Sequence, residues 1–206
     1  VGSGVSLGLL QLRRTGQSRT LSLGASILGL LGMAMAVAGL IVAYNPMVTF
    51  DPVGPGLFFN ALWFAYLATG LVFGLLALSS RGRRPAWYTN AAFATAGLLM
   101  AAFVTLTIRL GFHPGNMALG PTPDAELYTY SGVWLAIGIV VLAGGIWRGS
   151  RTLRLVSAGI IVAVVVKVFL IDMANLTGVL RAFSFVSLGA VLLAIGFVYQ
   201  RLLRKE

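Results

Sequence analysis

The stretch that decides the fold is 21–44, which reads LSLGASILGLLGMAMAVAGLIVAY and contains no charged residue. A helix of about 20 residues, rising 1.5 Å per residue, crosses the roughly 30 Å of hydrocarbon in a bilayer. Because a helix surrounded by lipid is apolar on every side, such a stretch needs no amphipathic period. The stretch therefore predicts a transmembrane helix.

Further apolar runs of similar length follow along the chain. The composition agrees with a membrane protein, since 58% of the 206 residues are hydrophobic and 10% are charged, against about 25% charged residues in ordinary soluble domains. Polar segments rich in Pro, Gly and Asn separate the runs. We therefore predict an all-α fold, a polytopic transmembrane helical bundle with about six spans, at 21–44, 57–79, 86–110, 127–147, 152–171 and 180–200.

The segment 1–12 is also apolar, but it lacks the charged start and the small-residue cleavage site of a signal peptide. We interpret it as the end of a preceding transmembrane helix, which leaves 13–206 as a six-span membrane domain. On this interpretation the chain is the C-terminal part of a longer protein.

The cations predict the orientation of the spans, because Lys and Arg in short loops are retained in the cytoplasm. Twelve of the 15 Lys and Arg residues lie in four groups that alternate with pairs of spans, so both ends of the segment are predicted to be cytoplasmic. Four of the five acids fall in the opposite loops. Despite a net charge of +10, this separation disfavours a nucleic-acid partner, which needs one continuous basic face. The groups are Arg13, Arg14 and Arg19; Arg81, Arg83 and Arg84; Arg148, Arg151 and Arg154; and Arg201, Arg204 and Lys205.

The residues offer little for catalysis or for cofactors. The chain has no Cys, which excludes disulfides and thiolate metal sites. The single histidine, His113, is followed by Asp124 and Glu126, but one His and two loop acids fall short of a metal site or a general-base constellation. No phosphate-binding loop, dinucleotide fingerprint or hydrolase motif is present. We predict no metal and no cofactor.

Charged residues in or beside the spans are the candidate site, because a charge at membrane depth is costly and persists only with a partner or a use. Lys167 lies in the fifth predicted span, Asp172 follows five residues later, and Arg181 opens the next span. The cluster is either a structural ion cluster that fixes the hairpin or a site for an anion or a proton, and the structural role is favoured. We expect Asp172 to contact Lys167 or Arg181. Residues five apart on a regular helix are displaced by about 140°, so a direct contact with Lys167 needs the helix to loosen at its end or the Lys stem to reach around, and Arg181 is favoured as the direct partner of Asp172.

Arg109, near the end of the third predicted span, is a candidate anion contact or an interfacial anchor. The segment 111–125 that follows is rich in Gly and Pro, and we expect it to form turns without regular strands.

The C-terminal part resembles a known family. The segments 126–134 (ELYTYSGVW), 147–154 (WRGSRTLR), 167–172 (KVFLID), 180–189 (LRAFSFVSLG) and 199–201 (YQR) are similar to the bacterial membrane proteins grouped as domain of unknown function 2339. The resemblance implies a long inner-membrane protein with many spans and gives weight to Lys167, Asp172 and Arg181. It implies no reaction.

Three classes of function stay open from the sequence. The favoured one is a non-enzymatic scaffold or accessory component of a membrane or envelope assembly, with lipids and other membrane subunits as partners. The second is a transporter or flippase for an anionic or lipid-linked substrate, which Lys167, Arg181 and Arg109 would serve. The third is a membrane-bound transferase, for which His113 offers the one candidate base.

Overall fold

The computed structural model describes residues 19–54 and 56–172, and a few single positions between 186 and 200. These residues are predominantly helical and contain no strand, as predicted. The predicted span 180–200 falls largely outside the described residues and the segment 1–12 falls entirely outside them. Within the described part, the helices long and apolar enough to cross a membrane are Leu23–Thr49, Trp63–Ser80, Ala86–Phe112, Asp124–Trp147 and Arg151–Asp172.

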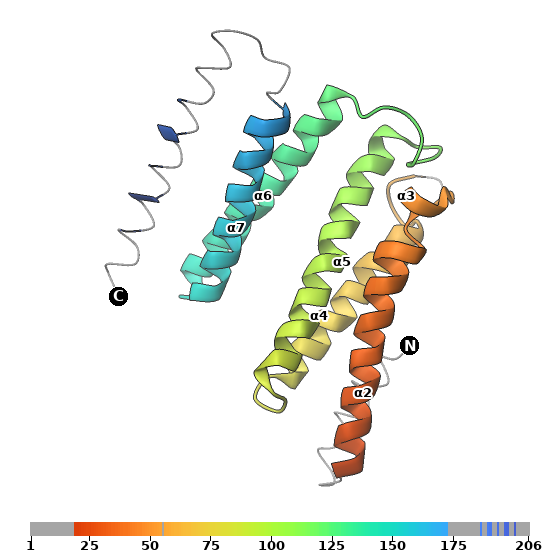
Figure 1. Cartoon of the computed structure of the whole chain (residues 1–206), viewed down its shortest axis with the longest axis vertical. Helices are drawn as coiled ribbons and strands as arrows, with labels where there is room; N and C mark the ends of the chain where they lie inside the picture. The colour runs from red at the N-terminus through yellow and green to blue at the C-terminus, as the bar shows by residue number, and fades with distance from the viewer. Residues whose placement is uncertain are drawn as a thin grey trace. The chain divides into compact units, whose positions relative to one another are not determined.

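The chain divides into two compact units, Val1–Pro121 and Thr122–Glu206 (Figure 1). Among the residues that the structure describes, three π-helical turns, labelled η, interrupt or extend the α-helices. The described elements of the first unit are α2 (Arg19–Ala36), η1 (Val37–Ala43), α3 (Pro46–Thr49), η2 (Trp63–Ala68), α4 (Thr69–Ser80) and α5 (Ala86–Phe112). Those of the second are α6 (Asp124–Trp147), α7 (Arg151–Lys167) and η3 (Val168–Asp172).

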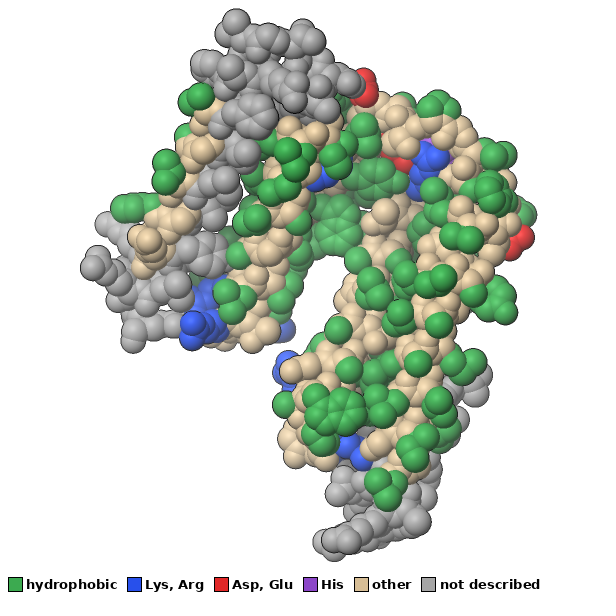
Figure 2. Space-filling model, viewed as in Figure 1, with side chains coloured by type: hydrophobic (Ala, Val, Ile, Leu, Met, Phe, Trp, Pro, Cys, Tyr) green, Lys and Arg blue, Asp and Glu red, His purple; other side chains and the backbone are tan. Residues whose placement is uncertain are grey.

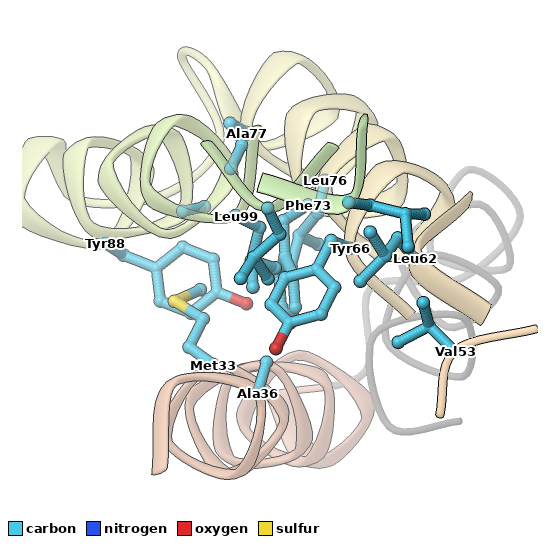
Figure 3. Close-up of a cluster of buried hydrophobic side chains, with 14 of the residues drawn as sticks. Met33, Ala36, Val53, Leu62, Tyr66, Phe73, Leu76, Ala77, Tyr88 and Leu99 are labelled. Atoms are coloured by element: carbon cyan, nitrogen blue, oxygen red, sulfur yellow. The ribbon is translucent and has the colours of Figure 1, made fainter. Parts of the chain in front are cut away.

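The core of the first unit is formed where α2 and η1 pack against α4, η2 and α5. Figure 3 shows the Tyr66 ring reaching across this core towards the helix that carries Ala36. Its hydroxyl donates a 2.5 Å hydrogen bond to the carbonyl oxygen of Leu40 in η1. A π-turn disturbs the regular i→i+4 ladder, and a polar backbone group in an apolar surrounding needs another partner. Tyr66 supplies that partner from η2, so the two π-turns are joined.

The second predicted span begins later than the sequence indicated. We expected it to start at residue 57, whereas the helix starts at 61 and continues as η2 from Trp63. The reason is Asn60, whose side-chain oxygen accepts a 3.0 Å hydrogen bond from the Leu62 amide and so takes the role of an N-cap. Phe59 immediately before it has a φ of 56°, which a helix does not allow.

The second unit is built on close contact between α6 and α7. A Cβ atom added at Gly138 would lie 2.8 Å from Cγ1 of Ile161, and one at Gly145 would lie 3.0 Å from the amide nitrogen of Arg154. Absent side chains therefore let the two backbones approach, which is how helices associate in lipid. Gly149, with a φ of 62°, makes the turn, and the Ser150 side chain accepts from the Leu153 amide at the start of α7.

Candidate functional site

Lys167 is the last residue of α7, and its ammonium is fully hydrogen-bonded within the second unit. Nζ lies 2.6 Å from the Leu127 carbonyl oxygen, 2.8 Å from Oγ of Ser131 and 2.6 Å from Oδ1 of Asp172. An ammonium has three N–H donors, so these three acceptors match its full capacity. The side chain is 24% exposed.

Asp172 closes the network from the other side. Its Oδ1 accepts from Lys167, and its Oδ2 accepts a 2.6 Å hydrogen bond from the Ser131 hydroxyl. Ser131 thus donates to the acid and accepts from the base. The Asp172 side chain is 2% exposed, and its charge is compensated by the ammonium beside it. We call these three side chains, with the Leu127 carbonyl, the Lys167 network.

The backbone explains why Lys167 reaches Asp172. On an α-helix, residues five apart are displaced by about 140° around the axis, which would turn the acid away from the base. The segment Val168–Asp172 is π-helical, however, and in a π-turn the hydrogen bond joins residues five apart, so positions i and i+5 lie on nearly the same side. The contact of Asp172 with Lys167 is one of the two contacts that we expected, and the π-turn is the loosening of the helix end that it needs.

Two members of the network were not found from the sequence. Ser131 lies in the fourth predicted span, and a single serine in a helix often bonds to the backbone of its own helix, so its presence does not indicate a site. The other member is the Leu127 backbone carbonyl, which no sequence pattern can indicate. Arg181, which we had expected to contact Asp172, lies outside the described residues. Its place in the cluster stays a prediction.

Arg109 is buried in the first unit, with 6% of its surface exposed. Nε donates to the Met117 carbonyl oxygen at 2.8 Å, and Nη2 donates to that of Gly120 at 3.1 Å. The guanidinium therefore holds the loop that follows α5. The described loop forms turns without strands, as predicted. A role for Arg109 as an anion contact stays a prediction.

The candidate base His113 is half-buried in the same loop, and its ring packs 3.4 Å from where a Cβ at Gly120 would lie. In the second unit Asp124 is exposed, whereas Glu126 is fully buried and accepts a 2.8 Å hydrogen bond from the Tyr130 hydroxyl. Among the residues that the structure describes, no three of the types His, Cys, Asp and Glu lie close enough to share a metal ion.

A family model described as "Predicted membrane protein (DUF2339)" matches residues 1–202. The chain belongs to this family. The match extends well beyond 126–201, where the sequence motifs gave the resemblance, and covers nearly the whole chain. Comparisons with curated proteins and with solved structures found no match.

Membership of DUF2339 and the apolar helices together make the chain a membrane-embedded protein. For this DUF2339 protein the Lys167 network is an ion pair at the end of an apolar helix long enough to cross a membrane, and its described donors and acceptors are matched to each other. The network joins the first turns of α6 to the last turn of the α7–η3 helix. Chemically, the network can hold the two helices of the hairpin together. The Lys167 ammonium or the Asp172 carboxylate becomes available to another ligand only if those contacts break.

Proposed function

We propose that this protein is a multi-pass component of the bacterial inner membrane that supports a membrane or envelope assembly without catalysing a reaction. The observation that carries the proposal is the saturation of the Lys167 ammonium by three protein acceptors. An intramembrane charge is costly, and here it is engaged in joining two helices. A cation that binds substrate would instead direct at least one donor towards the ligand.

The outer surfaces of the helices support the same proposal. In the second unit, large apolar side chains such as Val140, Trp147 and Leu170 are exposed on the helix pair, and Figure 2 shows hydrophobic side chains spread over the visible face of the helices. Surfaces of this kind are covered either by lipid or by further transmembrane helices. Membrane lipids and other membrane subunits are the partners that this chemistry fits.

The charges support cytoplasmic ends for the segment. In the first unit, Arg81 and Arg83 lie in the turn between α4 and α5, at the end opposite Asp51. In the second, Arg148 lies in the turn between α6 and α7 and Arg151 begins α7, both at the end opposite Asp172. Lys and Arg in short loops stay in the cytoplasm, so both turns are cytoplasmic on this proposal.

A second candidate, transport of an anionic or lipid-linked group, is favoured by the π-turn alone. If Val168–Asp172 changed to a regular α-helix, Asp172 would rotate away from Lys167 and free the ammonium for a substrate anion. π-turns occur frequently at functional sites.

The experiment that tests the proposal determines which proteins are extracted together with this chain, and in what ratio. The protein is expressed at its natural level, extracted with its surrounding lipid in polymer-bounded discs, and analysed by mass measurement and protein identification. We expect a fixed stoichiometry with at least one different membrane protein, retained when Lys167→Met and Asp172→Asn are combined. Recovery of the chain only by itself contradicts the assembly role. A double variant that is stable but no longer complements a deletion strain favours transport.

A further inference from the structure

The segment 45–60 contains α3 and connects η1 to the helix Trp63–Ser80 of the first unit, and it has an unusual surface. Its exposed residues are mostly large and apolar, and its one charged residue is Asp51. Phe59 is 82% exposed and Phe58 is 70% exposed. We call this segment the aromatic loop. The other exposed large apolar side chains in it are Met47, Val48, Phe50 and Leu57.

The polar groups of the aromatic loop are directed inward. Asn60, which is 4% exposed, donates through Nδ2 to the carbonyl oxygens of Gly56 at 3.0 Å and Leu57 at 3.3 Å. The Ala61 amide donates to the Val53 carbonyl oxygen at 2.9 Å. The arrangement is the reverse of a loop in water, where apolar side chains turn inward and backbone groups bond to solvent.

Further side chains satisfy backbone groups of the aromatic loop. Asn116, from the loop after α5, donates to the Phe50 carbonyl oxygen at 3.0 Å. The Trp63 indole donates to the Leu57 carbonyl oxygen at 3.1 Å, and Asn45 caps α3 by accepting from the Met47 amide at 3.0 Å. Internal satisfaction of backbone groups is what a segment in an apolar surrounding requires.

The backbone holds the aromatic rings outward at a conformational cost. Phe50 and Phe59 have φ values of 61° and 56°, in the left-handed region that residues with a side chain seldom adopt. Phe59 stacks on Trp63 with ring centroids 5.7 Å apart, and Phe58 lies 6.0 Å from the same ring. Trp63 in turn packs edge-on against Phe103 of α5 at 5.5 Å. The loop rings therefore continue the aromatic surface of the membrane helices.

We propose that the aromatic loop lies in the membrane interface and inserts Phe58 and Phe59 into the boundary between lipid headgroups and acyl chains. Its position between two membrane-spanning helices places it at the membrane surface. Phe, Leu and Trp side chains form the apolar faces of segments that lie in that boundary, and the neighbouring Trp63 is a residue enriched there. Lipid is the occupant that suits a surface continuous with the spans, with polar groups closed inward and one exposed acid, Asp51, left for water.

The absence of native cysteine allows a direct test. Single cysteines at Phe59 and at Asp51 carry a nitroxide, and the full chain is reconstituted in vesicles of phosphatidylethanolamine and phosphatidylglycerol. Collision of the nitroxide with oxygen, which concentrates in lipid, is compared with collision with a water-soluble nickel chelate. We expect the oxygen-to-nickel ratio at Phe59→Cys to exceed that at Asp51→Cys severalfold.

A probe at Val48, which is 60% exposed, repeats the measurement with Phe58 and Phe59 intact. The result at this position is then not affected by removal of a ring that inserts into the lipid. It is expected to show the same lipid signature as Phe59→Cys. A low oxygen-to-nickel ratio at Val48→Cys, with ready collision with the nickel chelate as at Asp51→Cys, would place the loop in water and overturn the proposal. Protection of Val48→Cys from both reagents would mean that protein covers the loop, which overturns it as well.

Discussion

The Lys167 ammonium and the Asp172 carboxylate lie 2.6 Å apart although the residues are five positions apart on one continuous helix. The π-turn makes this possible, and Ser131 of α6 locks the pair by bonding to both members. The ion pair therefore depends on two helices at once, and its disruption should affect the α6–α7 hairpin as a whole.

Neutralising one member of the pair should destabilise the protein more than neutralising both. Lys167→Met leaves Asp172 as a buried, uncompensated acid, and Asp172→Asn leaves the ammonium without its counter-charge. We expect a coupling free energy of about 1–3 kcal/mol in the double-mutant cycle. Thermal unfolding of the two single variants and the double variant in detergent measures it. Strict additivity would contradict an energetic role for this contact.

Removing the Ser131 hydroxyl should weaken the hairpin by itself. Ser131→Ala takes one acceptor from Lys167 and one donor from Asp172, each in a buried setting, and should lower the free energy of unfolding by about 1–3 kcal/mol. The control is Thr129→Val on the same helix, since that hydroxyl bonds only to the Ala125 carbonyl of its own helix in the structure. Equal melting temperatures for the two variants would refute the expected role of Ser131.

Tyr66→Phe should destabilise the first unit without changing its packing volume. The variant leaves the Leu40 carbonyl oxygen in η1 without the hydrogen bond that Tyr66 supplies, at a cost of about 0.5–2 kcal/mol for a bond inside a membrane protein. Tyr44→Phe is the control, because the Tyr44 side chain is exposed. Melting temperatures in detergent report the difference, and a loss no larger than that of the control counts against the interaction.

Gly138→Ala should separate α6 from α7. The added Cβ would lie 2.8 Å from Cγ1 of Ile161 and 3.3 Å from Cγ2 of Ile160, so the helices must shift; overpacking of this kind costs about 1–3 kcal/mol. Gly132→Ala on the same helix meets no atom within 4 Å and should be neutral or slightly stabilising. Thermal unfolding distinguishes the two, and similar curves would mean that the close approach contributes little.

Labelling of single cysteines tests the orientation without removing any cation. Cysteines at Ala86 and Thr152, both exposed beside the basic turns, should react with a membrane-impermeant maleimide only from the cytoplasmic face. A cysteine at Gly115 should react only from the opposite face. After the membrane is opened with detergent all three should react, which controls for accessibility. The reverse pattern in sealed vesicles would show that the topology is inverted.

The sequence alone determined the membrane class and most helix boundaries, because a helix that crosses hydrocarbon needs a minimum length and an apolar composition, and both can be read from the sequence. The predicted start at 86 and end at 147 coincide with the ends of α5 and α6. The start of the second span was misjudged by a few residues, since Leu57 and Phe58 are as apolar as the helix that follows Asn60. Composition does not distinguish an apolar loop at the membrane surface from the first turn of a span.

The sequence also singled out Lys167 and Asp172, because a charge at membrane depth stands out against apolar neighbours. Only the tertiary structure decided how they meet, for two physical reasons. A π-turn is a local departure from the helical repeat that packing selects and composition does not reveal. The Ser131 hydroxyl and the Leu127 carbonyl become partners of Lys167 only once α6 lies against α7. They are 36 and 40 positions from Lys167 in the sequence, and no local sequence pattern predicts which residues at that separation will meet.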